Sequence, residues 1–159
     1  MSILKVARIG HPAVRTPARN LTDPEITSAA TQRLIDDMIE TMHEYDGVGL
    51  AAPQIHINLR LAVIEVPAAD ERTEDGVPLT ILVNPVVIPL GTETVPGWEG
   101  CLSIPDLRGI VPRFARVRLE ARDRKGKPYT LEATEFLARV IQHECDHLDG
   151  DVYLDRMTE

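Results

Sequence analysis

The segment His143-Glu144-Cys145-Asp146-His147 constrains this chain more than any other feature of its sequence. Two histidines four positions apart stand one turn apart on the same face of an α-helix, so both imidazoles can reach one cation. Apolar residues at helical spacing accompany the segment and predict such a helix: Phe136, Leu137, Val140, Ile141 and Leu148. The rest of the fold must therefore bring at least one further ligand to this helix.

Glu144 adds chemistry to the histidine pair. It follows His143 directly, so it is turned by about 100° around the helix axis. In that position the carboxylate does not share the metal position easily, but it can reach a water held there. This arrangement is typical of a general base beside a Lewis acid.

A catalytic metal also needs a third protein ligand and one open position. The metalloprotease pattern HExxHxxGxxH would supply a histidine where this chain has Tyr153, and only twelve residues follow His147. The third ligand is therefore expected upstream of the helix. The candidates are a carboxylate or one of Cys101, His11, His43 and His56.

Cys101 is the favoured candidate because of its surroundings. It follows Gly97-Trp98-Glu99-Gly100, and the glycines on both sides of Glu99 allow the backbone to bend and to approach closely. Cys145 points about 200° away from His143 on the helix, and we interpret it as a core residue. Asp146 flanks the metal face, where we expect it to pair with an arginine or to orient a neighbouring group.

A third segment of interest, Gly47 to Gln54, contains small residues and a proline. Alone it indicates no more than a tight turn. Beside a metal, however, the neutral side chain of Gln54 could donate a hydrogen bond to a developing oxyanion.

The pattern along the chain predicts an α+β fold with mixed or antiparallel sheets around the C-terminal helix. After an irregular arm of about twenty residues, Asp23 as N-cap and Pro24 open a long N-terminal helix over 24–45, which Gly47 ends. The expected strands are 61–66, 79–83 and 86–88, followed by a hairpin over 116–133 around Gly126. Thr134 begins the second helix and Gly150 ends it, and we expect residues 1–159 to form a single catalytic domain.

Composition excludes several classes of protein. The formal net charge is −8, which argues against direct nucleic-acid binding. The sequence contains neither a membrane-length apolar run nor a signal peptide, and its two cysteines do not make a disulfide framework. We therefore expect a cytoplasmic protein without membrane association.

Three segments together resemble the peptide deformylases: GVGLAAPQ at 47–54, EGCLS at 99–103 and QHECDH at 142–147. The resemblance implies a metal-dependent hydrolase that removes the formyl group from the N-terminal formylmethionine of newly made proteins. It implies Fe(II), with Zn, Ni or Co as substitutes, held by Cys101, His143 and His147. It also implies catalytic roles for the Glu144 carboxylate, the Gln54 side chain, the Leu102 N–H and the Gly49 backbone.

The resemblance also implies a methionine pocket lined by Val48, Phe136 and Val140, and a contact of Arg108 with the peptide beyond methionine. Arg139 departs from the pattern, because many relatives carry an apolar residue there. The implied partners are N-formylmethionyl peptides, nascent chains and, transiently, the ribosome. Many relatives continue into a charged C-terminal helix linked to ribosome docking; this sequence stops at Glu159, so docking through that tail is not expected.

Two other functions compete with this one. A general metallopeptidase using HExxH would cleave internal peptide bonds, but the chain has no further ligand downstream of the helix. Alternatively, the metal is structural, or the protein is a catalytically inactive relative that serves as a binding module. A structural zinc site favours four protein ligands, whereas three are found here, and Glu144 and Gln54 are intact.

Overall fold

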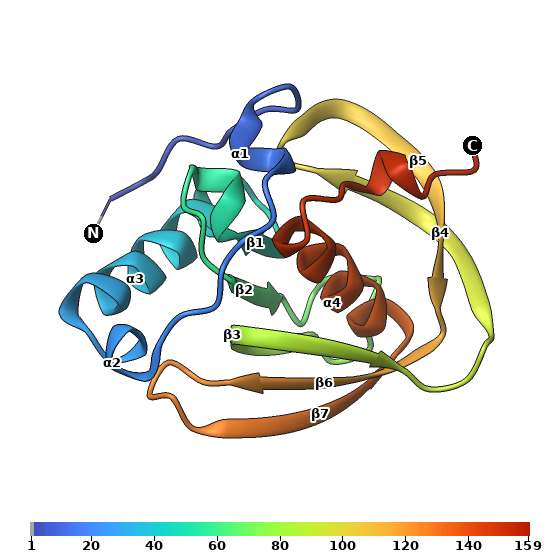
Figure 1. Cartoon of the computed structure of the whole chain (residues 1–159). Coiled ribbons are helices and arrows are strands. Elements are labelled where there is room, and N and C mark those ends of the chain that lie inside the picture. The colour runs from blue at the N-terminus through green and yellow to red at the C-terminus, as the bar shows by residue number, and fades with distance from the viewer. Residues whose placement is uncertain (1) are drawn as a thin grey trace.

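The computed structural model describes residues 2–159. Its helices and strands follow in the order α1 (Pro12–Arg15), α2 (Asp23–Ile26), α3 (Ala29–Glu44), β1 (Gly49–Ala51), η1 (Ala52–Ile55), β2 (Leu61–Val66), β3 (Val77–Pro89), β4 (Thr94–Cys101), β5 (Ile104–Phe114), β6 (Arg116–Arg122), β7 (Pro128–Thr134), α4 (Glu135–Leu148) and η2 (Tyr153–Asp155) (Figure 1). Among these residues, none of the helices is long and apolar enough to cross a membrane.

The strands form two antiparallel sheets, which confirms the predicted α+β class. The larger sheet has the order β1-β2-β3-β6-β7, and the smaller pairs β4 with β5. The predicted hairpin is β6 and β7, with Val117 opposite Ala133 and Gly126 in the turn at φ 83°. The two predicted strands around Asn84-Pro85 are instead one strand, β3, with an irregularity between Val83 and Val86.

The predicted N-terminal helix 24–45 is wrong in one respect, because the structure divides it into α2 and α3. Ser28 makes the break: its backbone is extended, and its hydroxyl accepts a hydrogen bond from the Thr31 N–H at 3.2 Å. A serine hydroxyl in this role replaces the helical bond and starts a new helix. The N-cap of α2 is Thr22 rather than Asp23.

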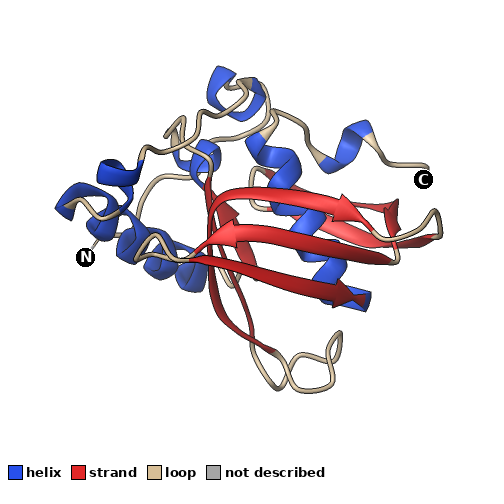
Figure 2. Cartoon of the chain, turned by 60° about the horizontal axis from the view of Figure 1, so that its bottom comes forward, coloured by secondary structure: helices blue, strands red, loops and turns tan. Residues whose placement is uncertain are grey.

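The sheet is buried on both faces around β2. Ala62 and Ile64 face one core cluster, which they share with Ile141 and Leu148 of α4. Leu61 and Val63 face the other cluster with α3. Figures 1 and 2 show α4 lying between the larger sheet and the β4–β5 pair, so both sheets can deliver residues to this helix.

Candidate metal centre

Three side chains converge at the end of β4 and on α4. The ligand atoms of Cys101, His143 and His147 lie within 4.8 Å of one another, and the Cys101 Sγ is 3.2 Å from the His147 Nε2. Cys101 reaches the helix because β4 ends there and turns into β5, with Cys101 opposite Ile104. The structure thus brings together the three residues that the sequence suggested as ligands.

The other candidate ligands lie outside this cluster. His11 and His56 pack against each other with ring centroids 4.5 Å apart. His43 on α3 pairs with Glu65 at 2.5 Å. The group of Cys101 and the two helical histidines contains neither pair.

The donor set fits a divalent transition metal. One sulfur and two imidazoles suit Zn and Fe better than a hard cation such as Mg. Around the cluster, two polar atoms are buried without a hydrogen-bond partner among residues 2–159: Glu144 Oε2 and His147 Nδ1. The Glu144 carboxylate also faces the cavity that contains Cys101 and His143, so the position next to the ligands has space and an unpaired acceptor.

A buried charge network orients His143. Its Nδ1 lies 2.8 Å from Oε1 of Glu99, and Glu99 accepts two hydrogen bonds from Arg113, each at 2.9 Å. Burial by itself would raise the pKa of Glu99, but the bonds with Arg113 and His143 lower it to about 2. The carboxylate therefore stays ionised and fixes the orientation of the imidazole.

The same network extends to Asp146, which confirms that this residue pairs with arginine. Asp146 Oδ2 accepts from Arg113 at 2.5 Å and from Arg156 at 2.7 Å. The roles of Glu99 and Arg113 were not predicted from the sequence. Only their charge in otherwise apolar or small-residue segments marked them.

Glu144 is buried next to Gly49. A Cβ built on Gly49 would lie 2.5 Å from Glu144 Oε1, so the close approach of strand and carboxylate requires glycine. Burial raises the pKa of Glu144 to about 7. A carboxylate with that pKa can accept and return a proton near neutral pH.

Gln54 is held by both ends of its amide. Its Oε1 accepts from the Ala51 N–H at 2.9 Å, and its Nε2 donates to Ser103 Oγ at 3.2 Å and to Cys101 Sγ at 3.4 Å. The amide N–H₂ group is thereby fixed beside the metal ligands. Cys145 is buried in the core cluster, which confirms the interpretation of that residue.

A cavity of about 600 Å³ opens over this cluster. Its lining includes every residue expected to bind substrate and every one expected to take part in catalysis: Val48, Gly49, Gln54, Leu102, Arg108, Phe136, Val140 and Glu144. Arg139 also lines it. This side chain donates to Glu99 Oε2, Val111 O and Val95 O, each at 2.7 Å, and so ties α4 to both strands of the small sheet.

A helix-borne histidine pair, a sulfur from a neighbouring strand and a buried carboxylate beside an open cavity define a metallohydrolase. The sequence matches the polypeptide deformylase family over residues 3–159. The chain belongs to this family, whose members remove the N-formyl group from the N-formylmethionine of nascent proteins.

Individual relatives agree with this assignment. The chain is 43% identical over 158 residues to peptide deformylase 2 of Pseudomonas putida, covering 99% of this chain and 89% of that protein. It is 44% identical over 158 residues to peptide deformylase 1 of Bordetella pertussis, covering 97% of this chain and 87% of the relative.

Solved structures show the same fold. A class I type b peptide deformylase from Acinetobacter baumannii with Met-Ala-Ser bound has a TM-score of 0.90 at 34% identity, covering 98% of both chains. A peptide deformylase from Synechococcus elongatus in complex with actinonin has a TM-score of 0.88 at 36% identity, covering 98% of this chain and 81% of that chain.

Proposed function

We propose that residues 1–159 form a single catalytic domain that hydrolyses the formamide bond of N-formylmethionyl peptides. Water adds to the formyl carbonyl, the C–N bond breaks, and the products are formate and a peptide with a free amine. The observation that carries the proposal is the convergence of Cys101, His143 and His147 beside the buried carboxylate of Glu144.

The metal ligands are proposed to be these three side chains, and the native ion Fe(II), with Zn, Ni or Co as substitutes. The thiolate and the two imidazoles support a borderline transition metal. When bound, the ion supplies a Lewis acid that polarises the carbonyl and lowers the pKa of water. The thiolate adds negative charge to the site, so the protein's own base and hydrogen-bond donors contribute more to the reaction.

Glu144 is proposed to take the proton from the attacking water and to pass it to the leaving nitrogen. Its pKa of about 7 allows both transfers at neutral pH. The Gln54 Nε2 and the Leu102 N–H are proposed to donate hydrogen bonds to the oxyanion. The bonds with Ala51 and Ser103 hold the Gln54 amide in place, and the N–H that now donates to Cys101 Sγ at 3.4 Å is the one that would turn to the oxyanion.

The substrate is proposed to lie along Gly49, whose backbone would bind the peptide. Val48, Phe136 and Val140 would contact the methionine side chain, and Arg108 the residues beyond it. The relative with Met-Ala-Ser bound supports a peptide ligand of this kind. A formyl carbonyl carries only hydrogen, so a tight site can admit it and exclude acetyl by sterics.

The decisive measurement is formate release from formyl-Met-Ala-Ser by protein prepared without oxygen. We expect turnover with Fe(II), Ni(II) or Co(II). Absence of formate with all three ions loaded would reject the proposal, and cleavage of internal bonds in unblocked peptides would favour a general metallopeptidase. We propose that the reaction takes place in the cytoplasm and that the protein contacts the ribosome transiently. Co-sedimentation with translating ribosomes tests the ribosome contact.

A further inference from the structure

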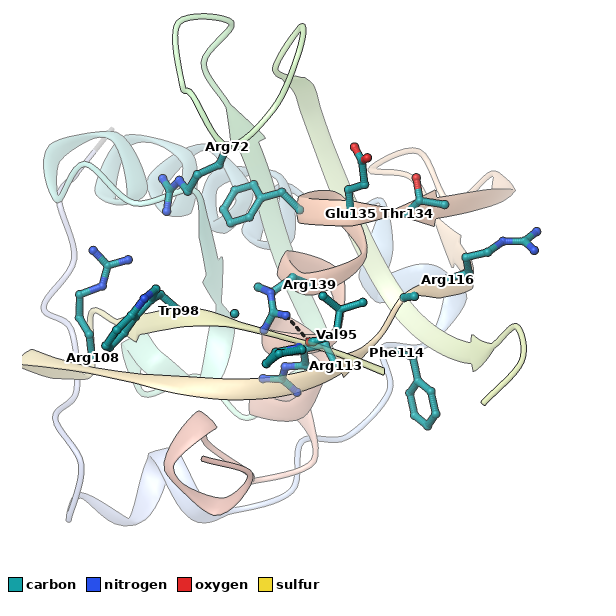
Figure 3. A pocket seen from close by; sticks show the side chains of 14 residues that line it. Arg72, Val95, Trp98, Arg108, Arg113, Phe114, Arg116, Thr134, Glu135 and Arg139 are labelled. Atoms are coloured by element: carbon teal, nitrogen blue, oxygen red, sulfur yellow. Dashed lines mark hydrogen bonds between the residues drawn. The ribbon is translucent and has the colours of Figure 1, made fainter. Parts of the chain in front are cut away.

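A second hollow of about 980 Å³ adjoins the cavity over the metal ligands (Figure 3). It lies along β4, beside the end of β5 and the first turn of α4. We call it the β4 groove. The two hollows share the lining residues Arg72, Trp98, Arg108, Phe136 and Arg139, so they lie next to each other.

The tryptophan and both phenylalanines of the chain gather in the β4 groove. The sequence has one tryptophan and two phenylalanines, and all three line the groove: Trp98, Phe114 and Phe136. Trp98 is 61% exposed and Phe114 is 37% exposed. Large aromatic side chains normally contribute to the core, so their exposure in one hollow is typical of a binding surface.

The charge of the groove is opposite to that of the chain. The formal net charge is −8, yet the groove is lined by five arginines and one carboxylate, Glu135. Three of the arginines have acidic partners: Arg72, Arg113 and Arg139. Within residues 2–159, the side chains of Arg108 and Arg116 form no ion pair, so their charges remain available to a ligand.

We infer that the β4 groove binds an acidic stretch of the same polypeptide whose formylated end occupies the active-site cavity. The inference rests on the proposed function and names a substrate class for it: formylmethionyl chains with Asp or Glu downstream of the first residues. The shared lining supports this occupant, because a chain that leaves the cavity past Trp98 and Arg108 would lie beside the groove. Guanidinium groups pair well with carboxylates, and Trp98 and Phe114 supply apolar contact.

The test compares kcat/KM for formyl-Met-Ala-Ser extended at its C-terminus by Asp, by Asn or by Lys residues. We expect the Asp peptide to be preferred over the Asn peptide by about tenfold, which corresponds to about 1.4 kcal/mol, and the Lys peptide to be the poorest. The preference should shrink at high salt, because the Debye length falls to about 3 Å at 1 M. Equal values for the three peptides would overturn the inference.

Variants locate the effect. Arg116 lines only the β4 groove, and Arg116→Glu should bring the Asp-to-Asn ratio close to one. Arg33→Glu makes the same charge change on the exposed surface of α3, outside both hollows, and should leave the ratio as in the wild type. If both variants lower the ratio equally, the preference reflects net charge, and the assignment to the groove is wrong.

Two further outcomes are distinguishable. Formate release from unextended formyl-Met-Ala-Ser without any preference among extended peptides supports the proposed function and overturns only the groove assignment. If a short single-stranded RNA inhibits formate release and the unformylated Asp peptide does not, the inference that the β4 groove binds a polypeptide is wrong. The groove would then bind the phosphate backbone of a nucleic acid.

Discussion

Glu144 combines burial, an unpaired oxygen and a raised pKa at one residue. Its Oε2 has no hydrogen-bond partner in the part of the chain that the structure describes, and burial raises its pKa to about 7. Glu144→Ala should therefore keep the bound ion and lose turnover by about 10²–10⁴, since a positioned general base contributes that much. Formate release and metal content measured on the same sample check this. His147→Ala is the contrasting variant, and it should lose the bound ion. Wild-type turnover by Glu144→Ala would contradict the assignment of Glu144 as the general base.

Gly49 tests the position of that carboxylate without altering its charge. A methyl group at residue 49 would lie 2.5 Å from Glu144 Oε1, so Gly49→Ala must displace Glu144. We expect turnover to fall by at least about tenfold while metal content is retained. Gly100→Ala is the control, because the nearest atoms to its Cβ are at 3.5 Å, an ordinary contact. Equal activity of wild type and Gly49→Ala would show that turnover does not require the close contact between residue 49 and the Glu144 carboxylate.

At the scale of elements, Arg113 joins β5 to β4 and to α4. The residue is 4% exposed and binds Glu99 and Asp146 together. Arg113→Ala would leave two buried carboxylates without this partner, so we expect a loss of about 3–5 kcal/mol in the free energy of unfolding. Urea denaturation measures it. Arg15→Ala removes an exposed pair with Asp155 and should cost much less; similar losses for both variants would contradict the role of burial.

Because of Tyr129, we expect the free energy of unfolding to decrease as the pH rises into the alkaline range. Its hydroxyl on β7 donates to Ile81 O of β3 at 2.7 Å, and burial raises its pKa from 10 to about 12. The folded state therefore keeps a proton that the unfolded chain loses above pH 10, so the contribution is complete below pH 10 and is lost as pH rises through about 12.

The variant Tyr129→Phe removes this titration. At neutral pH it should be less stable than wild type by about 1 kcal/mol, the value of one hydrogen bond. The difference should narrow between pH 10 and 12, because only the wild type loses the contribution of Tyr129. Denaturation midpoints across this range test the prediction, and a constant difference would refute it.

At the scale of the whole molecule, the metal ligands connect the two sheets through α4. Cys101 ends β4, and the two histidines belong to a helix that packs on the larger sheet. An ion bound only by the folded state stabilises it by mass action, so a chelator should lower the melting temperature. Calorimetry with and without chelator measures this. His147→Ala should respond far less, and an unchanged wild-type melting temperature would exclude an ion that bridges these elements.

Local periodicity was sufficient for the elements that depend on neighbours in sequence. The spacing of His143 and His147, the stripe of α4 and the alternation in β6 and β7 all predicted the observed structure. The long N-terminal helix was predicted incorrectly because apolar spacing continues across Ser28, while a single hydroxyl–amide bond starts a new helix there. No strand was predicted for β4 or β5, whose glycines and prolines obscure the pattern.

The helical histidine pair, the base beside it, the favoured third ligand Cys101 and the family could all be predicted from the sequence, because they depend on local geometry and on motifs. Three-dimensional packing was needed to show how Cys101 reaches the helix, how Glu99, Arg113 and Asp146 share their charges, and where the β4 groove lies. Those features depend on the register of β4 with β5 and on the packing of both against α4. Contacts between residues far apart in the chain leave no fixed spacing in the sequence from which they could be predicted.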